Sequence, residues 1–153
     1  MTNDWFECKV RYDKTMETGL QKKVTEPYLV EALSFTEAER RFIEEMTPML
    51  TGEFTVTDIK RARLAEIFES RNAAADRWYR AKLAFITLDE KTGAEKRTRQ
   101  NVLIQSTNLP TAIQELEEHM KGTLGDWVVE AVVETAIMDV FHYVQAERKK
   151  VEE

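Results

Sequence analysis

The chain contains two segments in which apolar and polar side chains alternate, one near its start and one in its second half. In "WFECKVRY", residues 5–12, Phe6, Cys8 and Val10 alternate with charged residues. A period of two is typical of a half-buried strand, because successive side chains point to opposite faces of a sheet. "WYRAKLAF", residues 78–85, repeats the pattern, so both segments are predicted to be strands.

The likeness between the two halves continues along most of the chain at an offset of 73 or 74 positions. Trp5 falls on Trp78, and Lys9 falls on Lys82. Further matches in the same order are Gly19 with Gly93, Phe42 with Leu116, Met46 with Met120, Gly52 with Gly125 and Phe68 with Phe141. Because the matches keep their order along the chain, we infer an internal duplication. Two long repeats do not suit a solenoid, which is built from many short repeats.

Each repeat is expected to continue with a hairpin and a second strand. Gly19 and Gly93 stand at the predicted reversals, where glycine permits the positive φ of hairpin loops. The second strands are predicted at residues 22–33 and 96–106. Pro27 lies within the first of them and has no N–H for a ladder, which predicts an edge position or a bulge.

A helix is predicted next in each repeat. Ser34 followed by Glu37 forms a capping-box pattern, and the second repeat offers Asn108 as the N-cap with Pro110 in the first turn. The expected buried stripe has helical spacing in both copies. It consists of Ala38, Phe42, Met46 and Met49 in the first repeat and of Ala112, Leu116 and Met120 in the second.

The third segment of each repeat, residues 52–68 and 125–141, is rich in Val, Ile and Thr. This composition favours two strands, or one long strand bent by a bulge near Asp58 and Ala131. A helix stays an alternative, because several valines of the second copy also fit helical spacing. The charged tail, residues 144–153, is expected to be a frayed helix or disordered.

Together these elements predict an α+β fold made of two ββα-β(β) units, with antiparallel sheets and one main helix per unit. The units are expected at residues 1–72 and 73–143, related by pseudo-twofold symmetry, and residues 144–153 form the tail. With 153 residues, the chain fits one compact domain overall.

Composition narrows the class of protein. The chain is 42% hydrophobic and 33% charged, which indicates a folded protein. It has no apolar run long enough to cross a bilayer and no signal-peptide pattern, so we expect a cytoplasmic protein without a membrane partner. Cys8 is the single cysteine, which excludes an intramolecular disulfide and a zinc site built from several thiolates.

No motif indicates a catalytic residue, a cofactor or a metal site. His119 and His142 are the two histidines and lack the spacing of metal ligands, and the glycines form no phosphate-binding loop. Carboxylates at equivalent positions keep an acid–base enzyme as a third hypothesis. These pairs are Glu53 with Asp126 and Glu66 with Asp139.

Basic and aromatic residues on the predicted strands are the best functional signal. If the acidic helices cover one side of the sheet, these residues share the other side. The combination suits single-stranded DNA or RNA, since bases stack on aromatic rings and cations contact phosphates. A net charge of −6 requires that the cations gather on one surface. The candidate binding residues are Trp5, Lys9, Arg11, Lys22, Lys23, Trp78, Arg80, Lys82, Lys96 and Arg97.

Two alternatives stay open for this face. It suits a protein partner equally well, because Trp, Tyr and Arg are enriched at interface hot spots. The chain is then a protein-interaction factor, or a self-assembling one that forms a homo-oligomer. Otherwise Trp5 and Trp78 pack in a second small core, and the cations are ordinary solvated strand residues.

Four phrases of the sequence carry a resemblance: "DWFECKVRYDKT", "KKVTEPYLVEALSFTEAE", "GEFTVTDIKRA" and "ETAIMDVF". With them the chain resembles a family of short proteins from Bacteroidetes and their phages that is catalogued only as a domain of unknown function. The resemblance covers residues 4 to about 141. It implies an intracellular bacterial or phage protein, and it implies no mechanism and no site residues.

Overall fold

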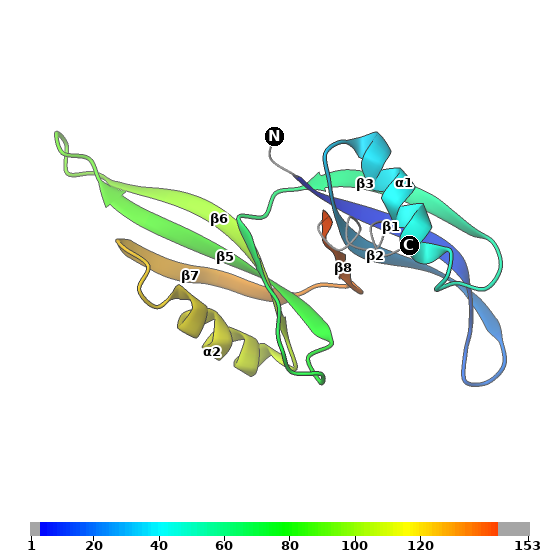
Figure 1. Cartoon of the computed structure of the whole chain (residues 1–153). Coiled ribbons are helices and arrows are strands. Elements are labelled where there is room, and N and C mark those ends of the chain that lie inside the picture. Colours follow the sequence, from blue (N-terminus) through cyan, green and yellow to red (C-terminus); the bar gives the residue numbers. More distant parts are fainter. Residues whose placement is uncertain (1–3, 144–153) are drawn as a thin grey trace. The chain divides into compact units, whose positions relative to one another are not determined.

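The protein folds as two similar α+β units, as the computed structural model of the chain shows (Figure 1). The structure describes residues 4–143, so the predicted tail at residues 144–153 lies outside the described residues. Unit 1 contains the chain up to Ala62 together with the segment from Ala136 onward, and unit 2 contains Arg63–Thr135. The predicted α+β class, with one helix and one sheet in each unit, is confirmed.

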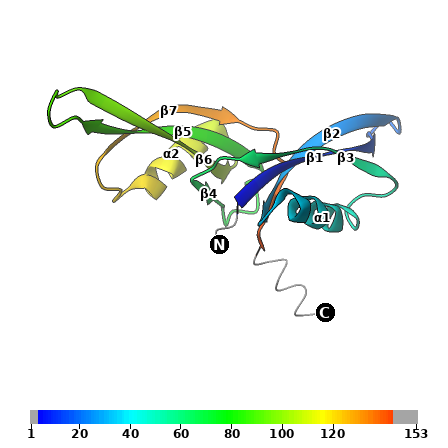
Figure 2. The same ribbon diagram turned by 90° about the horizontal axis from the view of Figure 1, so that it is seen from above.

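Unit 1 is a four-stranded sheet with a helix against one face (Figures 1 and 2). The strand order is β3-β1-β2-β8, and β1 pairs antiparallel with both β2 and β3. The elements are β1 (Asp4–Thr15), β2 (Gln21–Ala32), α1 (Phe35–Met46), β3 (Phe54–Ala62) and β8 (Val140–Phe141).

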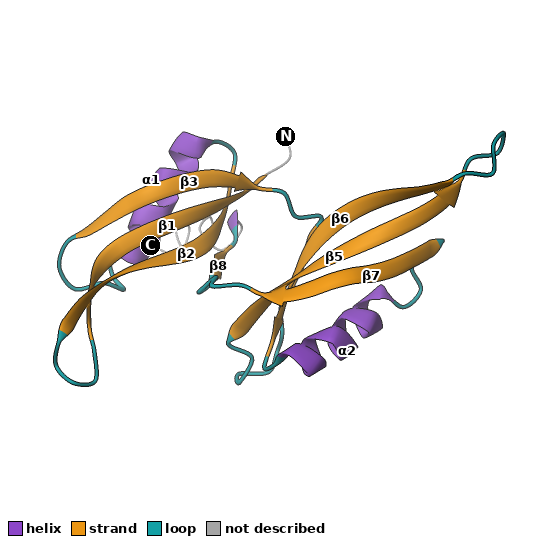
Figure 3. Cartoon of the chain, turned by 180° about the vertical axis from the view of Figure 1, so that it is seen from behind, coloured by secondary structure: helices purple, strands orange, loops and turns teal. Residues whose placement is uncertain are grey.

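Unit 2 repeats this arrangement (Figure 3), with the strand order β4-β6-β5-β7. Its central strand β5 pairs antiparallel with β6 and with β7, as β1 pairs with β2 and β3. The elements are β4 (Glu66–Phe68), β5 (Arg77–Leu88), β6 (Glu95–Ser106), α2 (Leu109–Met120) and β7 (Asp126–Glu134).

The alternating segments form the two central strands and bury their apolar faces under the helices, as predicted. Phe6, Cys8 and Val10 of β1 are fully buried in the core of unit 1. Ala81 and Leu83 of β5 are equally buried in the core of unit 2. Each hairpin reverses at the expected glycine, and both glycines have positive φ, 86° at residue 19 and 69° at residue 93.

Both helices begin where the capping patterns predict. The Glu37 N–H donates to the Ser34 hydroxyl at 3.1 Å, while the Glu37 carboxylate accepts from the N–H of Leu33 at 2.9 Å. Asn108 accepts from the Thr111 N–H at 2.9 Å. The predicted stripe is buried in both helices with one exception. Met49 lies beyond the end of α1 and is 55% exposed, because the helix ends at Met46.

The third segment forms strands and not a helix, and each copy has a bulge at the expected place. Lys9 pairs with Asp58 and Val10 with Val56, which leaves Thr57 as the extra residue of β3. Glu130 is the extra residue of β7 in the same way. Pro27 lies in β2 beyond the residues that pair with β8, and its carbonyl accepts from the Met138 N–H at 2.9 Å. Because β2 lies between β1 and β8, the predicted edge position is wrong for the strand as a whole.

A short parallel strand completes each sheet. This strand belongs to the repeat that forms the rest of the other unit. β8 follows β7 in sequence but pairs with β2 in unit 1, with Val140 opposite Leu29. β4 follows β3 but pairs with β6 in unit 2, with Ile67 opposite Leu103. The compact units therefore differ from the two repeats of the sequence, because each repeat supplies the fourth strand of the other unit.

Equivalent contacts hold the end of each short strand. The Tyr143 N–H donates to the Glu31 carboxylate at 2.9 Å just beyond β8. In unit 2 the Ser70 N–H donates to the side-chain oxygen of Gln105 at 3.0 Å. Glu31 and Gln105 occupy the same position in the two repeats, so the anchoring interaction is shared although the residue type differs.

Removing β8 should unfold or strongly weaken unit 1. A chain that ends at Thr135 loses Ile137, Val140 and Phe141, each at most 9% exposed. Each buried apolar side chain contributes about 1.5–3 kcal/mol, so we expect the free energy of unfolding to fall by about 3 kcal/mol or more. Urea unfolding followed by circular dichroism measures it. A chain that ends at Tyr143 keeps β8 and is the control; equal stabilities of the two chains would contradict the role of β8.

The buried thiol should make the stability of unit 1 depend on pH in alkaline solution. Burial, followed by the Glu7, Asp58 and Glu39 carboxylates, raises the pKa of Cys8 from 9.0 to about 12. The thiol therefore stabilises the fold fully below pH 9 and loses that contribution as the pH rises from 9 to 12, where only the unfolded thiol ionises. Urea unfolding of the wild type and of Cys8→Ala at pH 8 and pH 10 measures it; an identical pH dependence in both would contradict it.

Candidate functional site

Each sheet carries most of the predicted basic strand residues on the face opposite its helix, and Lys22 and Lys96 are the exceptions. In unit 1, Trp5, Lys9 and Arg11 of β1 alternate with the buried core residues, and Lys23 of β2 lies on the same face opposite Asp13. We call these four residues the strand face of unit 1. The alternation of β1 thus places four of the predicted residues on one surface.

The cations of the strand face of unit 1 are free of ion pairs. Arg11 and Lys23 are exposed and Lys9 is half-buried, and none of the three pairs with an acidic residue in the described part of the chain. Glu7, on the same face, is paired instead with Lys60 at 3.4 Å. The face therefore presents positive charge that no ion pair among the described residues neutralises, with Asp13 opposite Lys23 and Asp58 opposite Lys9 in the ladders.

A hollow of about 270 Å³ lies at the end of this face nearest the hairpin. Arg11 and Lys23 line it together with Thr55 and Thr57 of β3. Tyr12, Asp13, Glu53 and Phe54 line it too, so the hollow offers hydroxyl and cationic donors beside two carboxylates and two aromatic rings. Donors of this kind suit a phosphate or carboxylate group better than an apolar ligand.

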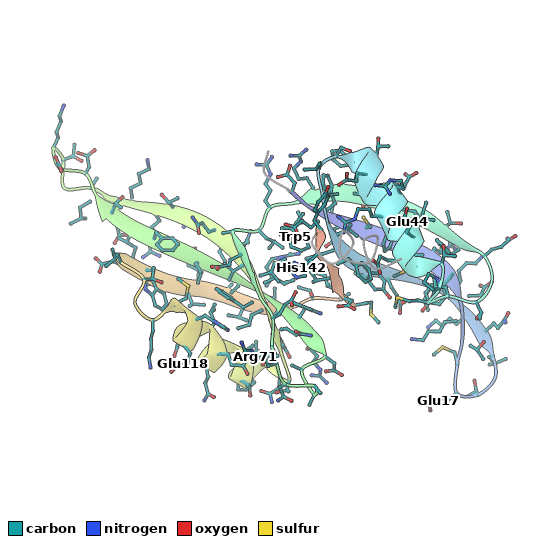
Figure 4. The ribbon with its side chains drawn as sticks, viewed as in Figure 1. Trp5, Glu17, Glu44, Arg71, Glu118 and His142 are labelled. Carbon is teal, nitrogen blue, oxygen red and sulfur yellow. The ribbon has the colours of Figure 1, made fainter. Side chains whose placement is uncertain are left out.

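Trp5 is half-buried at the other end of the same strand. Its ring meets the ring of His142 edge to face, with 5.2 Å between the centroids (Figure 4). His142 Nδ1 in turn lies 3.9 Å from the Glu31 carboxylate. The indole is thus oriented by packing against the end of β8 and keeps part of its surface accessible, which is what a stacking platform requires.

The strand face of unit 2 differs. Trp78 is only 2% exposed, which contradicts the hypothesis that it stands open beside Arg80 and Lys82 and agrees with the alternative in which it is packed. The alternation assigned its face correctly, but a period of two says nothing about what packs on that face. Arg80 and Lys82 are exposed and form no ion pair with a described residue.

Arg97 is not a free cation. Arg97 and its neighbour Arg99 on β6 reach over the small side chain of Ala84 to the bulge residue Glu130, at 3.1 and 2.8 Å. Hydrogen bonds from Arg99 first, and then from Arg97, lower the pKa of the Glu130 carboxyl below its ordinary value. This pairing reduces the positive charge of unit 2 where the sequence predicted a basic patch.

Lys22 and Lys96 lie on the opposite faces of their strands from Lys23 and Arg97, because neighbouring strand residues point to opposite sides. Both are exposed. The predicted pairs of adjacent basic residues therefore do not form continuous patches, although each residue is accessible on its own.

Sequence reasoning missed Arg41, which is 4% exposed within α1. Its guanidinium donates to the backbone carbonyls of Glu31 and, at 2.9 Å, of His142, and it lies 4.9 Å from the centre of the Tyr143 ring. It therefore joins α1, the end of β2 and the end of β8. The sequence could have indicated that Arg41 is buried, because it follows Ala38 by three positions and so falls within the apolar stripe of the helix.

Other chemistry finds little support in residues 4–143. The described residues contain no group of three or more His, Cys, Asp or Glu that could hold a metal ion. Glu53 and Asp139 belong to unit 1, whereas Asp126 and Glu66 belong to unit 2, so each predicted carboxylate pair is divided between the units. Glu53 is the member that lines a hollow, the one beside Arg11.

Comparison with known proteins identifies a family and no characterised relative. None of the helices in the described range is long and apolar enough to span a membrane. No curated protein and no solved structure matches the chain. The model of one family, described as a domain of unknown function, DUF4494, matches residues 4–143, and the chain therefore belongs to that family.

Proposed function

We propose that this chain is a non-enzymatic binding module whose strand face of unit 1 engages single-stranded nucleic acid. The observation that carries the proposal is the set of three cations, Lys9, Arg11 and Lys23, that share a face with Trp5 and form no ion pair with a described residue. Phosphates would contact the cations, with one of them in the hollow beside Arg11. A base would stack on the accessible part of Trp5, a contact worth roughly 1–3 kcal/mol.

Electrostatics favours moderate and strongly salt-dependent binding. The net charge of −6 repels a polyanion at long range, so affinity depends on local contacts at the basic face. The acidic residues of α1, Glu37, Glu39, Glu44 and Glu45, belong to the helix on the other side of the sheet. A nucleic acid strand is therefore expected to bind only on the face opposite the helix.

Unit 2 is expected to add less to binding. Its free cations on the equivalent face are Arg80 and Lys82, while Arg97 and Arg99 are engaged by Glu130 and Trp78 is buried. The proposal therefore assigns the main contacts to unit 1. The resemblance to proteins of Bacteroidetes and their phages supports a cytoplasmic role in such a cell.

A protein-interaction or self-assembling factor is the second candidate. The observation that favours it is the exposed apolar surface of the helices, where Leu109 and Ile113 of α2 are 41% and 36% exposed. These two residues are four positions apart and so lie on one side of the helix, as in a helix that docks a partner. Light scattering at several protein concentrations tests whether the chain assembles with itself.

Neutralising two cations of the strand face should weaken nucleic acid binding. We expect a labelled single-stranded oligothymidine to bind the wild type at low salt, and Lys9→Gln with Arg11→Gln to lower the affinity. The slope of log K against log salt should decrease by about 1.4, since each phosphate contact on a single strand contributes about 0.7. Fluorescence anisotropy measures both.

Lys91→Gln with Arg71→Gln, at two exposed positions of unit 2, removes the same number of positive charges; it is the matched control and should bind as the wild type does. Absence of binding by the wild type at low salt would refute the proposal. Equal weakening by the control would show that only net charge matters.

A further inference from the structure

Unit 1 has a second hollow, of about 420 Å³, between the first turns of α1 and the outer edge of β3. Phe35 and Glu39 line it from the helix, and Val56, Asp58 and Ile59 line it from the strand. Ligand-binding clefts typically have volumes of about 300–1,000 Å³, so the hollow can hold one or two side chains of a partner. None of Trp5, Lys9, Arg11 and Lys23 lines it, although Thr57 lines both hollows.

The strand that borders this hollow has hydrogen-bonding groups to offer. β3 is the last strand in the order β3-β1-β2-β8, and no described strand of unit 1 pairs with its outer side. Alternate N–H and C=O groups of an edge strand point outward and can pair with another extended chain. The bulge at Thr57 bends β3, and it limits such pairing to a short segment.

Phe35 is the apolar residue on the helix side of the hollow, and its ring is held in place. Phe35 is 47% exposed although its ring is fixed from behind. The Phe6 ring meets it edge to face at 4.8 Å, and the Arg61 guanidinium lies 5.6 Å from its centre. Val56 and Ile59 are half-buried against the core. The hollow therefore has a preformed apolar floor for a single apolar side chain.

The charged groups of the hollow are acidic. Glu39 and Asp58 are exposed, and neither forms an ion pair with a described residue. The nearby arginines are engaged elsewhere, Arg40 with Glu44 at 3.0 Å and Arg61 with Asp4 at 2.7 Å. Lys9 is the ladder partner of Asp58 and makes no ion pair with it. Two uncompensated carboxylates beside an apolar floor are complementary to a basic partner.

We infer that this hollow binds an extended basic peptide segment of a protein partner, which pairs with the outer edge of β3. The main chain of the peptide adds to the strand, one apolar side chain rests on Phe35, and a Lys or Arg side chain reaches Glu39 and Asp58. Strand addition of this kind draws affinity from main-chain hydrogen bonds and specificity from the pockets for alternate side chains. The peptide needs no contact with the cations of the strand face, although Asp58 lies opposite Lys9 in the ladder.

The second repeat shows which residues this fold accommodates at the positions of Glu39 and Asp58. Ile113 occupies the position of Glu39 in the second repeat, and Ala131 occupies the position of Asp58. Both residues lie in a unit with the same element order, in α2 and β7. Glu39→Ile with Asp58→Ala therefore removes both carboxylates while keeping residue types that fit this helix and this strand.

The experiment uses the full chain and a fluorescein-labelled peptide in which lysine and valine alternate. The wild type should bind the peptide, and Glu39→Ile with Asp58→Ala should weaken binding about tenfold, because two exposed charge contacts are lost. Glu17→Ala, in the hairpin between β1 and β2 (Figure 4), is the control for net charge and should bind as the wild type does. Fluorescence anisotropy gives the affinities.

A second probe separates strand pairing from simple charge attraction. The same peptide with all its backbone amides N-methylated keeps its charge but has no N–H to donate to an edge strand, so it should bind much more weakly. In NMR spectra the unmethylated peptide should shift the amide signals of β3 and leave those of β6 unchanged. Equal binding of the two peptides, or of the wild type and the Glu39→Ile, Asp58→Ala variant, would overturn the inference.

Discussion

The pairing of β8 with β2 and of β4 with β6 is the constraint on which the rest of the structure depends. A strand that carries fully buried residues such as Leu29 or Leu103 cannot leave its outer backbone groups without partners next to a core. The chain meets this need with strands of two and three residues taken from the far end of the other repeat. Neither repeat of the sequence therefore contains a complete sheet.

This requirement explains why the short strands receive so many specific contacts. Tyr28 stacks on Phe141 with 5.6 Å between the ring centres, and Arg41 bonds the carbonyl just after β8. In unit 2, His119 of α2 stacks on Phe68 of β4 at 4.3 Å. Two-residue ladders add little by themselves, so side chains from the helix and the neighbouring strand must hold them. Residues that looked ordinary in the sequence, Arg41 and His119, have this role.

Local features of the fold could be predicted from the sequence, because each depends on neighbouring residues. Period-two alternation located β1 and β5, the Ser34 and Asn108 caps located both helices, and comparison of the repeats located both bulges. The exchange of strands could not be predicted, since two or three apolar residues carry no information about which edge they join. The burial of Trp78 and the pairing of Arg97 with Glu130 also depend on tertiary packing. Among the candidate residues of unit 1, the alternation predicted the shared face of Trp5, Lys9 and Arg11, while their role in binding stays a prediction.

The internal duplication has a consequence for how such a protein can change over generations. When two identical subunits associate, every substitution appears twice and must suit both places. Here one gene encodes both copies separately, so Glu39 and Asp58 can coexist with Ile113 and Ala131 on the same scaffold. One copy can acquire a charged, ligand-specific surface while the other maintains the fold. Selection can therefore act on each half alone, so two units of the same fold can carry different surface chemistry.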